Sequence, residues 1–380
     1  MTTKEHAADV AIVGAGIVGL AHAYMALRKG YKVVLFEREK FAVGASIRNF
    51  GLVWPIGQPP GPTLDRALRS RNHWQEVSTQ AECWLNTNGS LHLAYQQDEW
   101  DVLNEFVDLY KAENGYQVEL MTPAAIQAGS SVANIDRLKG GLFSKTECTV
   151  NPREAIRKIP LWLEEKYGLT LRFGHAVTAI EMPKIKTSRE VWKVDKVFVC
   201  SGADCESLYP EIYDAYPVIK SKLQMMKAVS MDDDFKLGPT LCGGLTLLHY
   251  NSFSKCPSLP KVNARFSQNG QHELRENGIH VMLAQNNHGE LIIGDSHHYS
   301  MTVDPFERED VNEMILRYLE SFAHLTSYKV TERWHGIYLK SQAGTELITD
   351  PEPDVTIVNC LGGAGMTLSF GLAEEIIARL

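Results

Sequence analysis

Apolar positions recur along this chain with two different periods. The run Val10 to Val13 is entirely apolar, whereas Ile17 to Arg28 carries its apolar residues at helical spacing. A second apolar run follows within Lys32 to Arg38. A short apolar run is typical of a buried strand, and the helical spacing is typical of a helix packed on a core. The start of the chain therefore predicts a strand, a helix and a second strand parallel to the first.

The same patterns divide the middle of the chain. Helices are predicted over 63–85, 98–114, 121–127, 151–168 and 305–319. Strands are predicted over 90–95, 170–173, 196–203, 223–229, 279–284 and 290–294, the last three in a mostly antiparallel sheet. Two pairs, Thr122-Pro123 and Asn151-Pro152, are typical of helix starts. Residues 44–62 hold too many glycines and prolines for a regular element.

A buried strand that runs into a glycine turn returns twice, at 196–203 and at 354–380, where a helix follows. We therefore expect an α/β (α+β) fold, with a Rossmann-like nucleotide-binding domain and an inserted, mostly antiparallel-sheet substrate domain. Both domains are discontinuous in sequence. The expected boundaries are 1–85, 147–215 and 330–380 for the nucleotide-binding domain, and 86–146 and 216–329 for the substrate domain.

Composition narrows the class of protein. The 380 residues suffice for two domains, and 44% hydrophobic content fills their cores. A net charge of −8 argues against nucleic-acid binding, so any anion site must be a local cluster. Seven scattered cysteines form no CxxC pair and indicate structural thiols in a reducing compartment. No apolar run reaches membrane-span length and the start is polar, so we expect a cytoplasmic protein with no membrane span.

Three glycines, Gly14, Gly16 and Gly19, stand at the turn between the first strand and the first helix. In this context the pattern GxGxxG lets the backbone approach a pyrophosphate and lets the helix pack on the strand. Glu37 ends the second strand, 18 positions after Gly19, where a carboxylate accepts both hydroxyls of an adenosine ribose. The turn therefore predicts dinucleotide binding, and the acid disfavours a 2′-phosphate.

Several stretches together carry a resemblance to a known family. They are VAIVGAGIVGL with Glu37 and Arg38, NPREAIRKI before HAVTAIE, VFVCSGA, RWHGIYL and GGAGMTLSFGLAEEI. The chain resembles the FAD-dependent amine oxidoreductases of the D-amino acid oxidase, glycine oxidase and sarcosine oxidase type over nearly its whole length. The resemblance implies that ADP lies on the first glycine turn. It also implies that the flavin pyrimidine lies on the C-terminal turn, where a helix N-terminus stabilises negative charge.

The cysteine that some sarcosine oxidases link to flavin is missing near Tyr338, and no histidine stands in the loop of Arg48, so we expect FAD bound non-covalently. The cofactor residues that the resemblance implies are Gly14, Gly16, Ile17, Val18, Gly19, Glu37, Arg38, Ala45, Ser46, Arg48, Asn49, Val177, Gly202, Gly336, Gly363, Gly365, Met366 and Thr367. No metal site is expected.

Three further stretches, GASIRNFGLVWPIGQP, GGLTLLHYNSF and GELIIGDSHHYS, are similar to a branch proposed to oxidise aminoethylphosphonates or their N-methyl derivatives. This resemblance implies hydride transfer to FAD from the carbon that bears the amine. Hydrolysis of the imine would then give phosphonoacetaldehyde and an amine, with oxygen or another electron acceptor reoxidising the flavin. Tyr338 stands where glycine and D-amino acid oxidases carry the arginine that clamps the substrate carboxylate, and Lys340 follows two residues later. Neither side chain reproduces a planar guanidinium fork, whereas single donors suit a tetrahedral phosphonate.

The candidates for the anionic end of the substrate are Tyr250, Tyr338, Lys340, His249, Arg48, Arg265, His297 and His298. Each has a plainer interpretation: the two adjacent histidines as a solvated turn, Arg265 as a surface charge, Arg48 as a flavin ligand. Two other functions stay open. One is an oxidase or dehydrogenase for glycine, sarcosine or a D-amino acid, and the other is a flavin-binding protein without turnover. An NAD-dependent dehydrogenase would not need the second glycine turn at Gly362 to Thr367.

Overall fold

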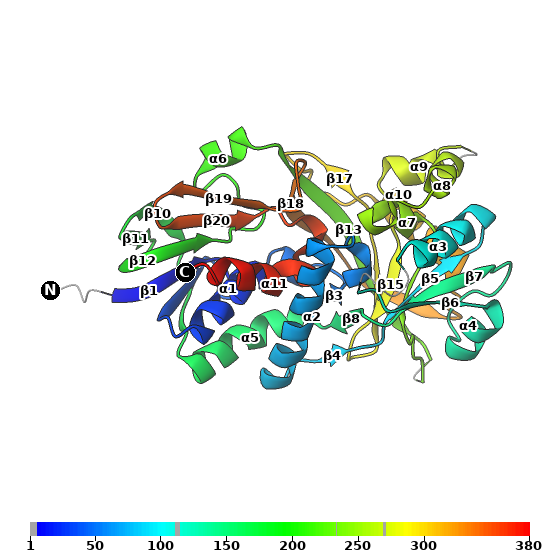
Figure 1. The fold of residues 1–380 in the computed structure, drawn as a ribbon, viewed down its shortest axis with the longest axis horizontal. Coiled ribbons are helices and arrows are strands. Elements are labelled where there is room, and N and C mark those ends of the chain that lie inside the picture. Colours follow the sequence, from blue (N-terminus) through cyan, green and yellow to red (C-terminus); the bar gives the residue numbers. More distant parts are fainter. Residues whose placement is uncertain (1–5, 111–114, 233, 269–270) are drawn as a thin grey trace.

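The computed structural model describes residues 6–110, 115–232, 234–268 and 271–380, and places two large sheets side by side along the long axis of the molecule (Figure 1). The first is an eight-stranded sheet that contains the first and the last strand of the described chain. The second, a nine-stranded sheet, is built from the segments between them. This is the mixed α/β fold that the hydrophobic pattern predicts, with one sheet inserted into the chain of the other.

Five strands of the first sheet run parallel. They are β1 (His6–Val13), β2 (Val33–Glu37), β9 (Thr170–Phe173), β12 (Val191–Val199) and β20 (Val355–Asn359). Antiparallel strands β10 (Val177–Glu181), β11 (Lys184–Thr187) and β19 (Leu347–Glu352) flank them. Since parallel strands end at one edge of a sheet, the turns after β1, β2, β12 and β20 meet there, which is where such sheets bind ligands.

Helices α1 (Ile17–Arg28), α2 (Pro62–Gln80), α5 (Pro152–Tyr167) and α11 (Gly365–Ile377) pack together beside this sheet (Figure 1). The α5 helix begins and ends where the sequence predicts. Its N-cap Asn151 accepts a hydrogen bond from the Glu154 backbone N–H at 3.4 Å, and Gly168 ends it in the left-handed conformation. Arg66 of α2 ties that helix to α11, because its guanidinium donates to Glu375 at 2.7 Å and to Glu346 at 2.8 Å.

A long antiparallel ribbon forms one side of the second sheet. Strand β13 (Val218–Ser230) pairs with β18 (Tyr328–Ser341) along its whole length, with Ser221 opposite Tyr338. The remaining strands are β5 (Ser90–Ala94), β6 (Val118–Met121), β7 (Gly140–Ser144), β14 (Thr240–Cys242), β15 (Met282–Gln285), β16 (Glu290–Gly294) and β17 (His298–Tyr299). Strand β18 thus lies in the second sheet, although the expected boundary at residue 330 assigns almost all of it to the first domain.

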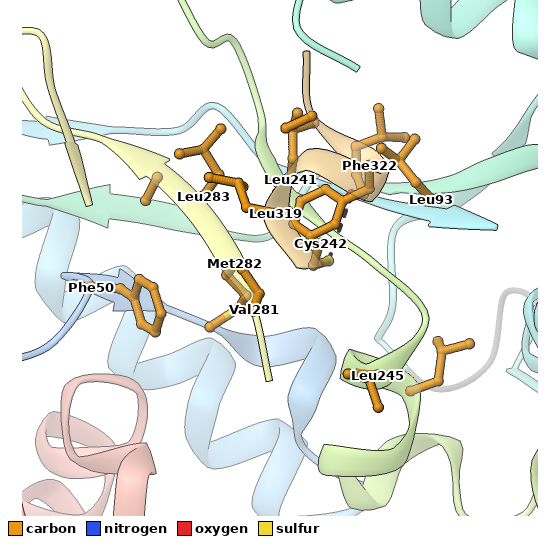
Figure 2. Close-up of a cluster of buried hydrophobic side chains, with 14 of the residues drawn as sticks. Phe50, Leu93, Leu241, Cys242, Leu245, Val281, Met282, Leu283, Leu319 and Phe322 are labelled. Carbon is orange, nitrogen blue, oxygen red and sulfur yellow. Dashed lines mark hydrogen bonds between the residues drawn. The ribbon is translucent and has the colours of Figure 1, made fainter. Parts of the chain in front are cut away.

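The core of the second sheet is apolar and continuous. Figure 2 shows Leu241, Val281, Leu283 and Phe322 among the side chains that gather there, and all four are fully buried. The helices around this sheet are α3 (Gln97–Tyr110), α4 (Pro123–Gly129), α7 (Leu245–His249), α8 (Leu259–Phe266), α9 (His272–Glu276) and α10 (Glu309–Phe322). Helix α6 (Pro210–Ala215) lies in the segment between the two sheets.

Differences from the expected elements lie mainly at their ends. The helix expected over 63–85 ends at Gln80, and the one expected over 305–319 begins only at Glu309. Residues 111–114 of the expected helix 98–114 lie outside the described residues. Residues 44–62 are largely irregular, as expected, but hold η1 (Ala45–Ile47), η2 (Pro55–Gly57) and β3 (Leu52–Val53), which pairs with β8 (Cys148–Val150) beside β4 (Leu85–Asn86).

The cysteines and the helices can both be compared with what the sequence predicts. All seven cysteines are free and buried, as structural thiols should be. Within the described ranges, no helix combines the length and the hydropathy that crossing a membrane requires.

The contact between α2 and α11 gives a stability prediction. A Cβ at Gly371 would lie 2.4 Å from the Arg66 carbonyl oxygen, so Gly371→Ala forces the two helices apart. We expect the free energy of unfolding in urea to fall by about 1–3 kcal/mol. Gly129→Ala is the matched control, since nothing lies within 4 Å of that position. Equal stability of the two variants would contradict the contact.

Candidate active site

The glycine turn after β1 is built as close backbone contacts. Gly14 has a φ of +102°, and a Cβ there would lie 2.4 Å from the Cys200 carbonyl oxygen. A Cβ at Gly19 would lie 1.9 Å from the Gly14 carbonyl oxygen, so α1 crosses the turn in direct contact. Only glycine fits both positions. The N-terminus of α1, with Gly16, Ile17 and Val18, therefore faces the edge where the strands end.

Polar side chains hold the neighbouring loops onto this turn. Glu37 at the end of β2 accepts a hydrogen bond from the Ala15 backbone N–H at 3.0 Å. The Ser46 hydroxyl oxygen accepts one from the Ile17 N–H at 2.9 Å, which fixes the loop of Ala45 on the helix N-terminus. Arg38 pairs with Asp204 at 2.9 Å, beside the open turn of Gly202.

The remaining cofactor candidates lie around the same edge or along the junction with β18. Val177 begins β10, two residues after His175, whose N–H donates to the Glu37 carbonyl oxygen at 2.9 Å. Asn49 donates to the Ala45 carbonyl oxygen at 2.8 Å. Arg48 donates to the His335 carbonyl oxygen at 3.4 Å, and a Cβ at Gly336 would lie 3.1 Å from the Arg48 carbonyl oxygen. The loop therefore lies directly against the second sheet.

The C-terminal glycine turn opens on the same space. Gly363 is exposed in η4 (Gly362–Ala364), just before α11 begins at Gly365. A Cβ at Gly363 would lie 3.3 Å from the Tyr338 hydroxyl, and one at Gly362 would lie 3.6 Å from Lys340 Cγ. This turn therefore brings the N-terminus of α11 next to the end of β18.

A short segment connects this turn to the second sheet. The Trp54 backbone N–H donates to the Thr367 hydroxyl at 2.9 Å, and the Trp74 indole N–H donates to the Met366 carbonyl oxygen at 2.7 Å. The Ile56 N–H donates to the buried Glu147 carboxylate at 3.0 Å. A Cβ at Gly57 would meet the Tyr250 ring at 2.6 Å, so the segment packs tightly on that ring.

Three histidines and one carboxylate gather beyond Tyr250, and we call His249, His280, His297 and Asp295 the imidazole cluster. The rings of His249 and His280 stack with centroids 4.0 Å apart and an interplanar angle of 6°. Asp295 Oδ1 lies 3.3 Å from His280 Nδ1 and 3.7 Å from His297 Nδ1. His297 Nδ1 also lies 3.1 Å from the Gly278 carbonyl oxygen.

Burial keeps the imidazoles of this cluster neutral. It lowers the pKa of His280 to about 3 and that of His249 well below its usual range, with neighbouring cations adding to the effect at His249. Burial also lowers the pKa of His297, which the Asp295 carboxylate partly opposes. The same burial raises the pKa of Asp295 to about 6, so its carboxyl is mostly ionised at neutral pH.

His249 stands at the accessible edge of the imidazole cluster. It is exposed to solvent, and the protein packed around its ring lowers its pKa well below the usual range. Tyr250 and Tyr338 are likewise partly accessible, and burial raises the pKa of each phenol. The Tyr250 hydroxyl contacts only the Met282 sulfur, at 3.9 Å, among the described residues.

Several polar atoms behind Tyr250 have no hydrogen-bond partner within the described chain. They include Trp54 Nε1, both ring nitrogens of His92 and His280 Nε2. His92 is 1% exposed, and its ring lies 5.8 Å from that of Trp54. Buried polar atoms without partners are costly, so these atoms indicate a place that takes a polar ligand or water. No grouping of three His, Cys, Asp or Glu among the described residues is arranged to hold a metal ion.

The structure brings together five of the eight predicted substrate residues. Tyr250, Tyr338 and Lys340 lie around the imidazole cluster, to which His249 and His297 belong, and Lys340 Nζ lies 5.4 Å from the centroid of the Tyr299 ring.

The other three lie apart. Arg265 of α8 pairs with Asp98 at 2.9 Å and with Glu99 at 2.5 Å, so the carboxylates of α3 occupy its guanidinium. His298 is exposed on β17, while the adjacent His297 is buried. Arg48 lies in the loop against β18, on the cofactor side of the junction.

Sequence reasoning missed His280 and Asp295. Asp295 directly follows the strand 290–294 and precedes two histidines, so a polar group at a strand end was visible in the stretch GELIIGDSHHYS. His280 carries no such signal, because it is a single histidine at the start of an apolar strand. Its role depends on the backbone pairing of His280 with Asp295, at 2.9 and 2.7 Å.

The glycine turns and the Glu37 carboxylate fit an adenine dinucleotide such as FAD. The turn after β1 is closed to any side chain, Gly202 is open, and an acid stands where a ribose would lie. The N-terminus of α11, beside Gly363 and Tyr338, offers the second anchoring point.

Comparison with known proteins agrees with this geometry. The family described as "DAO: FAD dependent oxidoreductase" matches residues 9–379. An opine oxidase component of Agrobacterium tumefaciens is 21% identical over 389 residues, covering 97% of this chain and 93% of that protein. A glycerol 3-phosphate dehydrogenase of Caloramator mitchellensis is 26% identical over 202 residues, and the match spans only 42% of that protein.

Solved structures share the fold. Glycine oxidase from Geobacillus kaustophilus superposes with a TM-score of 0.78 at 18% identity, covering 99% of this chain and 94% of that one. L-proline dehydrogenase from P. horikoshii gives a TM-score of 0.78 at 18% identity, covering 98% and 93%.

The close contact at the first glycine turn gives a prediction about the cofactor. Gly14→Val places a branched side chain where Cys200 already lies 2.4 Å from the Cβ position, and it strains a φ of +102°. We expect the purified variant to lose its bound flavin, measured as the ratio of flavin to protein absorbance, with circular dichroism reporting the fold. Gly344→Ala, with its nearest neighbour 4.0 Å away, should keep the wild-type ratio. A yellow Gly14→Val protein would contradict the assignment of the turn.

Proposed function

This chain belongs to the DAO family of FAD-dependent oxidoreductases, and on that premise we propose that it oxidises an aminoethylphosphonate or its N-methyl derivative. The broader activity, oxidation of an amine or amino acid with FAD, follows from the family. The finer proposal rests on the set of hydrogen-bond donors around the imidazole cluster. The position that holds a carboxylate-clamping arginine in related oxidases is Tyr338, and Lys340, His249 and His297 stand around it.

These donors suit a tetrahedral anion. A carboxylate is planar and pairs best with the planar fork of a guanidinium, whereas a phosphonate presents three oxygens in different directions. Lys340 offers an ammonium point charge, Tyr338 a hydroxyl and His249 a ring nitrogen, each from a different direction. The Lys340 ammonium also lowers the pKa of both His249 and His297, which places its charge close to the imidazole cluster.

When bound, FAD supplies the acceptor for a hydride from the carbon that bears the amine nitrogen. The protein contributes position and electrostatics. The N-terminus of α11 at Gly365 favours negative charge at the pyrimidine end of the cofactor. The rings of Trp54 and Tyr250, with centroids 6.2 Å apart, would form an aromatic side of the site. The resulting imine is hydrolysed to phosphonoacetaldehyde and an amine, and oxygen or another acceptor takes the electrons.

The experiment that tests the substrate is anaerobic mixing of the purified yellow protein with single amines. We expect N-methyl-aminoethylphosphonate and aminoethylphosphonate to bleach the flavin band rapidly, while glycine and sarcosine leave it unchanged. Glycine and sarcosine carry a carboxylate and lack one methylene between the amine and the anion, so the comparison separates aminoethylphosphonate oxidation from amino acid oxidation. Bleaching by glycine or sarcosine alone would overturn the phosphonate proposal and return the chain to amino acid oxidation.

Lys340→Ala tests the anion contact. Losing one charge-assisted contact of about 1.5–3 kcal/mol should raise the Michaelis constant for the phosphonate by about 10-fold or more, with bound FAD and the maximal rate retained. Steady-state kinetics and the flavin absorbance of the variant measure both. Lys329→Ala is the matched control, because this exposed lysine lies at the other end of β18. Loss of flavin from Lys340→Ala would show that the lysine serves the cofactor instead.

A further inference from the structure

The imidazole cluster contains titratable side chains that anion recognition does not require. We propose that His249, stacked on His280 and backed by Asp295, accepts the proton that the substrate ammonium must lose before its carbon gives up a hydride. His249 is the catalytic residue in this step, and His280 and Asp295 are positioning residues. The step rests on the proposed amine oxidation but applies to any substrate in which an ammonium group accompanies an anion.

The reaction needs such an acceptor. An ammonium nitrogen has no lone pair to form the C=N bond as hydride leaves, so the amine must be neutral. An alkyl ammonium has a pKa near 10.4, and at neutral pH only on the order of one molecule in a thousand is neutral. A protein that waited for this fraction would lose most of its rate.

His249 is placed to take the proton. Its ring is the accessible member of the cluster and lies beside Tyr250 at a centroid distance of 4.9 Å. Burial keeps its imidazole neutral, so a ring nitrogen lone pair is free at neutral pH. The parallel stack on His280 at 4.0 Å holds the ring in one orientation.

Asp295 compensates the charge that then forms. Its carboxylate lies 3.3 Å from His280 Nδ1, on the far partner of the stack, and 3.7 Å from His297 Nδ1. Proton donation from His280 Nδ1 to Asp295 leaves His280 Nε2, a buried atom without a partner in the described chain, as an acceptor. With a pKa of about 6, Asp295 is ionised above that pH, and its charge lies behind His280, the ring on which the His249 imidazolium is stacked.

Other charged and titratable groups face the cluster from every neighbouring element. They are His92 of β5, Tyr250 after α7, Arg275 of α9, Tyr299 of β17, and Tyr338 and Lys340 of β18. The two cations, Arg275 and Lys340, oppose protonation of His249 when no anion is bound. A bound substrate anion reverses this balance, so the imidazole gains its proton only when substrate is present.

In the proposed step the proton moves only between the substrate and His249. The N–H bond of the substrate ammonium breaks and an N–H bond of the His249 imidazolium forms, leaving the lone pair on the amine. That lone pair becomes the second bond of C=N as the hydride leaves the carbon. The imidazolium pairs with the substrate anion until the products leave and the proton returns with them. A zwitterionic substrate thus binds without net exchange of protons with solvent.

The first test counts protons and requires no turnover. Propylphosphonate carries a methyl group in place of the ammonium, so it brings the anion without the proton. Calorimetry on the holoenzyme near pH 8, in two buffers of different ionisation enthalpy, should show uptake of about one proton per anion bound. We expect almost none in His249→Gln, and reduced uptake in Asp295→Asn that recovers at lower pH. His324→Gln, an exposed histidine after α10, should behave as wild type.

The second test is the pH profile of anaerobic flavin reduction, measured as kcat/KM. The wild-type profile should be flat between pH 7 and 9, because the zwitterion is the reacting form. In His249→Gln the substrate must arrive neutral, so kcat/KM should rise about tenfold per pH unit over that range. Bound flavin and thermal melting confirm that the variant is folded.

Uptake of a proton by His249→Gln equal to that of wild type, or none by wild type, would overturn the proposal. If glycine or sarcosine rather than a phosphonate bleaches the flavin, the proposed substrate fails on its own. Propionate then replaces propylphosphonate in the proton count, and the role of His249 stands or falls on that count.

Discussion

The contact between Gly14 and Cys200 is the constraint on which the rest of the structure depends. Two backbones meet there so closely that a Cβ would lie 2.4 Å from a carbonyl oxygen. The flanking hydrogen bonds, from Gly14 N–H to the Phe36 carbonyl oxygen and from Cys200 N–H to the Val13 carbonyl oxygen, fix the ends of three parallel strands at one level. These contacts between main-chain atoms fix the direction in which helix α1 leaves the turn. They thereby fix the edge of the sheet at which the cofactor is expected.

A second set of contacts fixes the predicted substrate side relative to this edge. The loop of Arg48 and the segment of Trp54 reach from the first domain to β18 and to α11, through hydrogen bonds from Trp334 to the Arg48 carbonyl oxygen and from Trp54 to Thr367. The end of β18 therefore lies against the C-terminal glycine turn with Tyr338 between them. Because β13 runs beside β18 along its whole length, the imidazole cluster at the end of the second sheet is held relative to the first.

The sequence predicts the strand, helix and second strand that the structure contains around the first glycine turn, whereas the predicted substrate residues come together only in part. The glycine turn and Glu37 belong to one continuous strand-helix-strand segment, and the Asn151 cap acts on Glu154 three residues later, so the pattern of a short segment suffices for them. Arg265 looked like a free cation, but its partners Asp98 and Glu99 lie 167 and 166 positions away. His280 lies next to Asp295 because their two backbone segments pair, and no local sequence pattern predicts that pairing. A sequence pattern therefore identifies functional residues only where they lie close together in the chain.

The order of the segments has a consequence for biosynthesis. The first sheet is complete only when β20 pairs with β12, and α1 is covered only when α11 packs on it. These last elements follow β1 by more than 340 positions, since β20 begins at Val355. At about 5–20 residues per second, a ribosome spends on the order of a minute between the two. The face of α1 that α11 covers in the folded protein therefore stays uncovered on the nascent chain until the last residues are made.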